Sequence, residues 1–82
     1  MPRYLLETAS ISPAEREQAA ATAALRYPEV AIEQRFSARD DNGGRDIWVC
    51  RAPSAAHLRR WAEACRLALA VLQPIDTDRS PL

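Results

Sequence analysis

The sequence contains no lysine, so all eleven of its basic side chains are arginine, and eleven acidic side chains balance them. The resulting net charge of zero gives no electrostatic drive towards the phosphates of nucleic acids or an anionic membrane. No stretch approaches the roughly 20 consecutive apolar residues of a membrane span, and the start of the chain has no apolar secretory signal. We therefore expect a cytoplasmic protein with neither nucleic acid nor membrane as a partner.

Cysteine and glycine are scarce, with two residues of each. Cysteines in the cytoplasm are expected to be reduced, so we predict no disulfide. Gly43 and Gly44 belong to a predicted turn, which leaves no glycine-rich loop for a phosphate. With 82 residues, the chain is expected to bury only about 60 to 65% of its unfolded surface. Such a monomer is marginally stable, which favours a homo-oligomer.

The first half of the chain predicts a strand followed by a helix. The run RYLLE predicts a strand over residues 3–7. Ser12 is a good N-cap, Pro13 suits the first helical position and Glu15 completes a capping box, so we predict a helix from Pro13 to about Arg26. Its narrow apolar stripe is expected to consist of Ala14, Ala21, Ala24 and Leu25.

The second half predicts a hairpin, a helix and a final strand. Alternating residues predict a strand with one face made of Val30, Ile32, Gln34 and Phe36. The turn sequence DDNGG follows, and a strand resumes at Arg45. A second helix is predicted from Ser54, and a last strand from about Val71 to Ile75. The apolar positions expected along the second helix are Leu58, Trp61, Ala62, Cys65 and Leu69.

The order β-α-β-β-α-β predicts an α+β fold of the ferredoxin-like class, a four-stranded antiparallel sheet with two helices on one face. Residues 1–75 are expected to form this single domain, followed by a flexible tail over 76–82.

Both faces of the strand after the hairpin are too apolar to face water. Ile47 and Val49 point to one side, whereas Trp48 and Cys50 point to the other. Helices can cover only one of these faces, so we expect a homodimer in which the two sheets stack on each other.

The segment from Arg45 to Cys65 contains both cysteines and the only histidine. Cys50 and His57 lie near one strand-to-helix corner and could share a metal ion, with Glu7, Glu33 or a partner-chain residue completing the site. The alternative is a surface histidine beside a core cysteine. Cys65 lies roughly 16 Å further along the helix, so it cannot join Cys50 on a metal or in a disulfide. We expect Cys65 to be a buried thiol and Cys50 to be the more reactive one.

The two tryptophans are expected on strand and helix faces that meet. They either fill the core or, with Tyr4 and His57 nearby, line a pocket for a flat or apolar ligand between the sheet and the second helix. The sequence leaves both alternatives open.

Three motifs, MPRYLLE, RDIWVCRAPS and HLRRWAEAC, carry a resemblance that covers nearly the whole chain. The chain resembles a small family of nickel-binding actinobacterial proteins, known largely as a domain of unknown function, which form ferredoxin-like dimeric α/β barrels. Family members commonly carry a cysteine and a histidine where this chain has Trp48 and Trp61. Indole offers no lone pair to a metal, so the resemblance implies the fold and a degenerate nickel site.

Three functions remain after these observations. The first is a homodimeric binding protein with a small-molecule or metal ligand. The second is a small enzyme without an organic cofactor, of the monooxygenase, isomerase or cyclase type, with His57 as its base. The third is a structural or interaction module. A cavity between Trp48 and Trp61 would favour the first two, whereas tightly packed indoles would favour the third.

Overall fold

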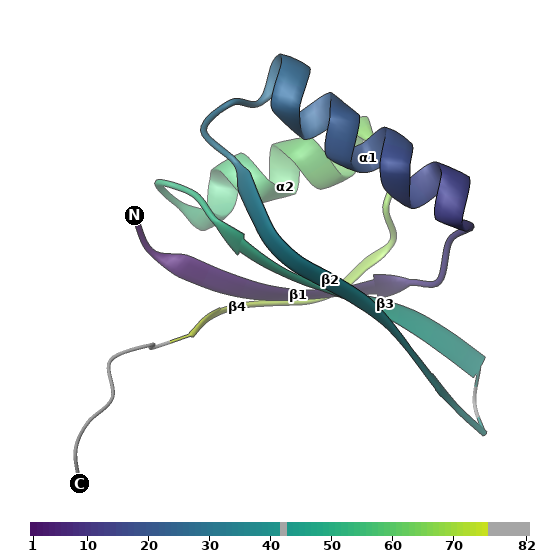
Figure 1. The fold of residues 1–82 in the computed structure, drawn as a ribbon. Coiled ribbons are helices and arrows are strands. Elements are labelled where there is room, and N and C mark those ends of the chain that lie inside the picture. Colours follow the sequence, from purple (N-terminus) through teal and green to yellow (C-terminus); the bar gives the residue numbers. More distant parts are fainter. Residues whose placement is uncertain (42, 76–82) are drawn as a thin grey trace, which may run out of the picture.

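The computed structural model describes residues 1–41 and 43–75, so the predicted tail over 76–82 lies outside the described residues. Six elements follow one another along the chain in the predicted order (Figure 1). They are β1 (Arg3–Ala9), α1 (Pro13–Arg26), β2 (Ala31–Asp40), β3 (Gly43–Arg51), α2 (Ala55–Ala64) and β4 (Leu69–Ile75).

The strands form one antiparallel sheet in the order β2-β3-β1-β4, and both helices lie on the same side of it (Figure 1). This arrangement confirms the predicted ferredoxin-like α+β fold. Neither helix of the described part of the chain has the length and hydropathy needed to cross a membrane.

The core lies between the sheet and the helical layer. Two indoles fill its centre, surrounded by smaller apolar side chains from every element. Its buried apolar members are Tyr4, Leu6, Ala19, Ala23, Val30, Trp48, Cys50, Ala52, Leu58, Trp61, Ala62 and Leu67.

Helix α1 has the predicted ends, because its capping box forms. The Ser12 hydroxyl accepts from the Glu15 backbone N–H at 3.2 Å, and the Glu15 carboxylate accepts from the Ser12 N–H at 3.0 Å. The predicted apolar stripe is wrong, however. Ala19 and Ala23 are the buried residues of this helix, whereas Leu25 is 82% exposed. Alanines lie all round α1, so its sequence gives little contrast from which to assign the buried face.

A β-bulge in β2 breaks the predicted alternation. Ile32 pairs with Cys50, but the register shifts before Gln34, which pairs with Val49. Phe36 therefore lies on the opposite face of the sheet from Ile32, next to Ile47, and is 49% exposed. One extra residue in a strand turns every later side chain to the other face, so the predicted grouping of Ile32 with Phe36 is wrong.

Helix α2 is shorter than its apolar spacing predicts. Its end is closed by bonds from the Leu67 N–H to the Ala62 carbonyl (2.9 Å) and from the Arg66 N–H to the Glu63 carbonyl (3.0 Å). This pattern is a Schellman motif, which requires a left-handed residue just after the helix, and Arg66 adopts a φ of 58°. Leu69 consequently begins β4 and does not extend the stripe of α2.

Candidate functional site

Trp48 of β3 and Trp61 of α2 meet inside the core, as predicted. Their ring centroids are 5.3 Å apart with an interplanar angle of 81°, an edge-to-face contact. Both side chains are fully buried, and each indole N–H donates a hydrogen bond. The Trp48 N–H donates to Thr8 Oγ1 at 3.1 Å, and the Trp61 N–H donates to the Ala19 carbonyl at 3.0 Å. Rings in such contact leave no room for a ligand between them.

The remaining members of the predicted pocket do not change this result. Tyr4 is buried in the same core. His57 is only partly buried and shares a hydrogen bond of 2.8 Å between its Nδ1 and the Ser54 hydroxyl at the start of α2. The geometry thus supports core filling as the role of the aromatic residues.

The predicted metal ligands lie in different environments. Cys50 is fully buried on the helix-covered face, where burial and, to a smaller extent, the charge of Glu33 raise the pKa of its thiol to about 12. A metal binds the thiolate, which is strongly disfavoured there. Glu7 lies on the other face of the sheet, beside Ile47 and 3.4 Å from Arg45 Nε.

Glu33 is already engaged in ion pairs. Its two carboxylate oxygens lie 2.7 Å from Arg3 Nε and 2.6 Å from Arg51 Nε. Within residues 1–41 and 43–75, no three histidine, cysteine, aspartate or glutamate side chains form a group that could hold a metal ion.

Cys65 differs from its predicted state. It caps the C-terminus of α2 and is only partly buried. Burial raises the pKa of its thiol, but a hydrogen bond from Thr22 and the charge of Arg26 act in the opposite direction. The structure therefore makes Cys65 the more accessible thiol and Cys50 the protected one, the reverse of the prediction, because α2 ends before Cys65 can join its buried stripe.

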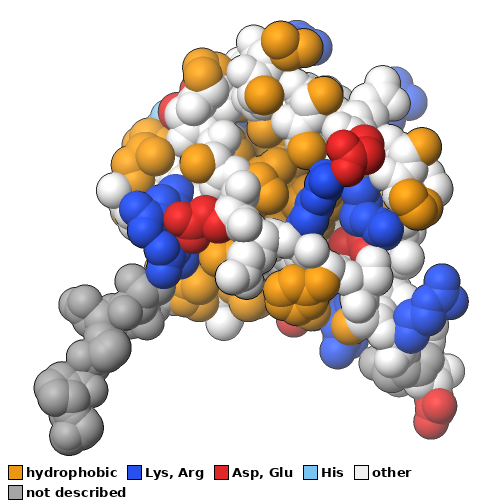
Figure 2. Space-filling model, in the orientation of Figure 1, with side chains coloured by type: hydrophobic (Ala, Val, Ile, Leu, Met, Phe, Trp, Pro, Cys, Tyr) orange, Lys and Arg blue, Asp and Glu red, His pale blue; other side chains and the backbone are white. Residues whose placement is uncertain are grey.

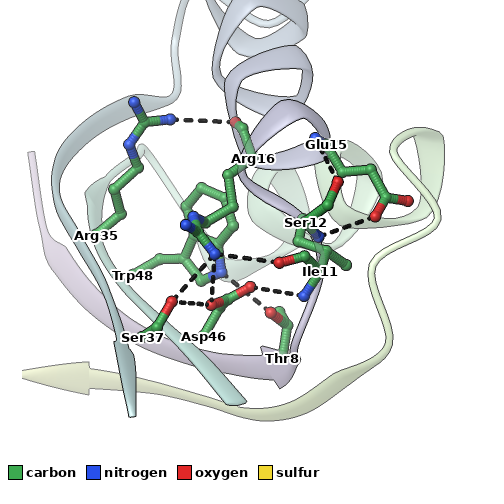
Figure 3. Close-up of polar contacts among 9 residues, drawn as sticks. All are labelled: Thr8, Ile11, Ser12, Glu15, Arg16, Arg35, Ser37, Asp46 and Trp48. Atoms are coloured by element: carbon green, nitrogen blue, oxygen red, sulfur yellow. Dashed lines mark hydrogen bonds and ion pairs between the residues drawn. The ribbon is translucent and has the colours of Figure 1, made fainter. Parts of the chain in front are cut away.

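A buried acid that the sequence analysis missed lies at the other end of the core. Asp46 of β3 is only 1% exposed, yet its carboxylate accepts three hydrogen bonds (Figure 3). The donors are the Ile11 backbone N–H at 3.0 Å, the Ser37 hydroxyl at 2.7 Å and the Arg16 guanidinium at 3.3 Å. A buried carboxylate is tolerated when it is paired and hydrogen-bonded in this way.

These contacts tie three elements together at the start of α1. Arg16 Nη1 also donates to the Ile11 carbonyl and the Ser37 hydroxyl, each at 3.1 Å. Arg35 of β2 donates to the Arg16 carbonyl at 3.1 Å (Figure 3). Arg35 also forms an ion pair with Glu17. The Asp46 oxygens accept hydrogen bonds from protein donors, so we infer that this cluster holds α1 in place. The burial of Asp46 could have been predicted from the alternation in RDIWVC, because it puts Asp46 on the same face as Trp48.

Comparison with protein-family models, curated proteins and solved structures finds no match for the chain. The function is therefore inferred from the arrangement and chemistry of its side chains.

Proposed function

We propose that the chain is a homodimeric interaction module whose two copies stack through the uncovered face of their sheets, closing a dimeric α/β barrel. We call this surface the open face. It is formed by the six apolar side chains that alternate with the core-facing residues of the four strands: Leu5, Phe36, Ile47, Val49, Val71 and Ile75.

The exposure of this apolar surface is the observation that carries the proposal. Both helices lie on the other side of the sheet, and hydrophobic side chains reach the lower surface of the molecule, away from the helices (Figures 1 and 2). Phe36 is half exposed, and the other five side chains are partly exposed. Contiguous apolar surface on a small protein marks an interaction site, and a second copy offers an apolar surface of the same kind.

The charged groups near these apolar residues are ion-paired, which suits a protein interface. Arg3 and Arg51 share the Glu33 carboxylate at one end of the strands. Glu7, which pairs with Arg45, lies within the open face, between Ile47 and Val71. Protein interfaces contain polar and charged groups beside their apolar residues, and these charges have partners of opposite sign. The chain as a whole has no net charge, so two copies approach without long-range repulsion.

The packed indoles favour an interaction module over a protein with a ligand pocket between them. A pocket ligand would need space between Trp48 and Trp61, which are in contact. The enzyme alternative depends on His57, whose Nδ1 shares a hydrogen bond with the Ser54 hydroxyl.

Sedimentation velocity tests the proposal. The wild-type chain should sediment as a dimer at micromolar concentration, whereas Ile47→Glu, which places a charge in the open face, should sediment as a folded monomer. Leu25→Glu is the matched control, because Leu25 is equally apolar and more exposed but lies on α1. It should remain dimeric. A monomeric wild-type chain at micromolar concentration would refute the proposal.

A further inference from the structure

A cleft of about 290 Å³ opens on the helical layer, between α1 and the segment that leads out of α2. It is separate from both the open face and the tryptophan pair. Its size is near the lower limit of ligand pockets, about 300 Å³, so it suits a small molecule rather than a nucleotide.

Part of the cleft lining is apolar. Ala19 and Leu67 are buried there, and Ile11 is partly buried beside them. Ala19 contributes only a methyl group to this lining, and the Schellman motif fixes the backbone at Leu67. A short aliphatic group would therefore find an apolar surface that the chain itself does not fill.

The rim carries one charge of each sign. Glu15 lies in the first turn of α1, and hydrogen bonds from Ser12 lower the pKa of its carboxyl, which keeps it ionised. Arg66 supplies a guanidinium, which is always charged. No hydrogen bond or ion pair engages that guanidinium within residues 1–41 and 43–75.

The backbone of Arg66 supports a role for its side chain. Its φ of 58° is the left-handed conformation that closes a helix, and glycine is the usual residue there. A non-glycine residue in this region is strained, so an arginine is unfavourable for the fold alone.

We propose that this cleft binds a free amino acid with an aliphatic side chain. Its carboxylate pairs with Arg66, its ammonium group pairs with the free oxygen of Glu15, and its side chain lies on Ile11, Ala19 and Leu67. This site goes beyond the proposed dimer, because the cleft lies on the opposite layer of the fold, and Ile47→Glu should retain it.

Titration of the wild-type protein with L-leucine, followed by amide chemical shifts, tests the site. Saturable shifts should appear at residues lining the cleft, such as Gln18 and Thr22. 4-Methylpentanoate lacks the ammonium group and isopentylamine lacks the carboxylate, so each should bind at least about tenfold more weakly. Equal binding of all three probes, or no saturable shift at millimolar leucine, would overturn the proposal.

Two substitutions remove the charges while preserving the fold. Glu15→Gln keeps a residue that can complete the capping box, and Arg66→Gly places the preferred residue at the left-handed position. Each should weaken leucine binding at least about tenfold, and Arg66→Gly should do so without loss of thermal stability. Arg59→Gln, on the exposed surface of α2, should bind normally. Unchanged affinity in both cleft variants would refute the assigned contacts.

Cys65 gives an independent readout because it also lines the cleft. Bound leucine should slow its alkylation by iodoacetamide in the wild-type protein, and it should not do so in Arg66→Gly. Equal protection in both proteins would contradict a site that uses the guanidinium.

Discussion

Trp48 and Trp61 contact each other edge to face at the centre of the core, and each indole N–H donates a hydrogen bond to an oxygen atom of another element. The pair joins β3 to α2. Through Thr8 and the Ala19 carbonyl it also reaches β1 and α1, so two side chains link four elements of the fold.

Trp61→Ala should lower the free energy of unfolding by about 3–5 kcal/mol, because it removes a fully buried indole and leaves a cavity. Urea denaturation followed by circular dichroism measures this loss, at a fixed protein concentration because dimerisation also affects stability. Trp61→Phe keeps a ring beside Trp48 but loses the N–H bond, so its loss should be smaller. A change below about 1 kcal/mol for the alanine variant would contradict the core assignment.

Asp46→Ala should lower the free energy of unfolding by at least about 2 kcal/mol. The substitution leaves the partly buried Ile11 N–H without its acceptor and removes the ion pair with Arg16. The same measurement on Asp41→Ala, an exposed turn position, should show a change within about 0.5 kcal/mol. Similar values for the two variants would show that the buried cluster does not hold α1 in place.

Iodoacetamide at pH 8 should label Cys65 much faster than Cys50 in the folded protein. The reactive species is the thiolate, and the pKa of Cys50 is raised to about 12 by burial. Mass spectrometry of the peptides gives the two rates, with the urea-unfolded chain as the control in which both thiols should react alike. Faster labelling of Cys50 would contradict its place in the core.

The raised pKa of Cys50 also predicts a pH dependence. Between its ordinary value near 9 and the folded value of about 12, the unfolded chain releases a proton that the folded chain retains. Stability should therefore decrease as pH rises through this interval. Cys50→Ala should remove this part of the decrease, because it removes the titrating thiol.

Nickel should bind poorly, in spite of the resemblance to a nickel-binding family. The resemblance predicted from the sequence motifs aligns Trp48 and Trp61 with positions where that family commonly has cysteine and histidine, and indole has no lone pair for a metal. Isothermal titration of the chain without a histidine tag should show at most weak binding that His57→Ala abolishes. A tight stoichiometric site that survives in His57→Ala would mean that the alignment behind this prediction is wrong.

Local signals in the sequence were sufficient for the type and order of the elements. Ser12, Pro13 and Glu15 define the start of α1 through contacts within a single turn, and DDNGG predicts the hairpin for a similarly local reason. The tryptophan contact was also predictable, because strand alternation and helical spacing each assign one indole to the shared core.

Only the tertiary structure decided which faces and sites these elements form. A single bulge before Gln34 sends Phe36 to the open face, and packing selects Ala19 and Ala23 from a helix rich in alanine. The end of α2 exposes Cys65 beside the cleft, and Asp46 finds partners that lie far away along the chain. Hydrophobic periodicity records which residues prefer burial, but register, helix phase and the pairing of distant polar groups depend on the packing of the whole chain.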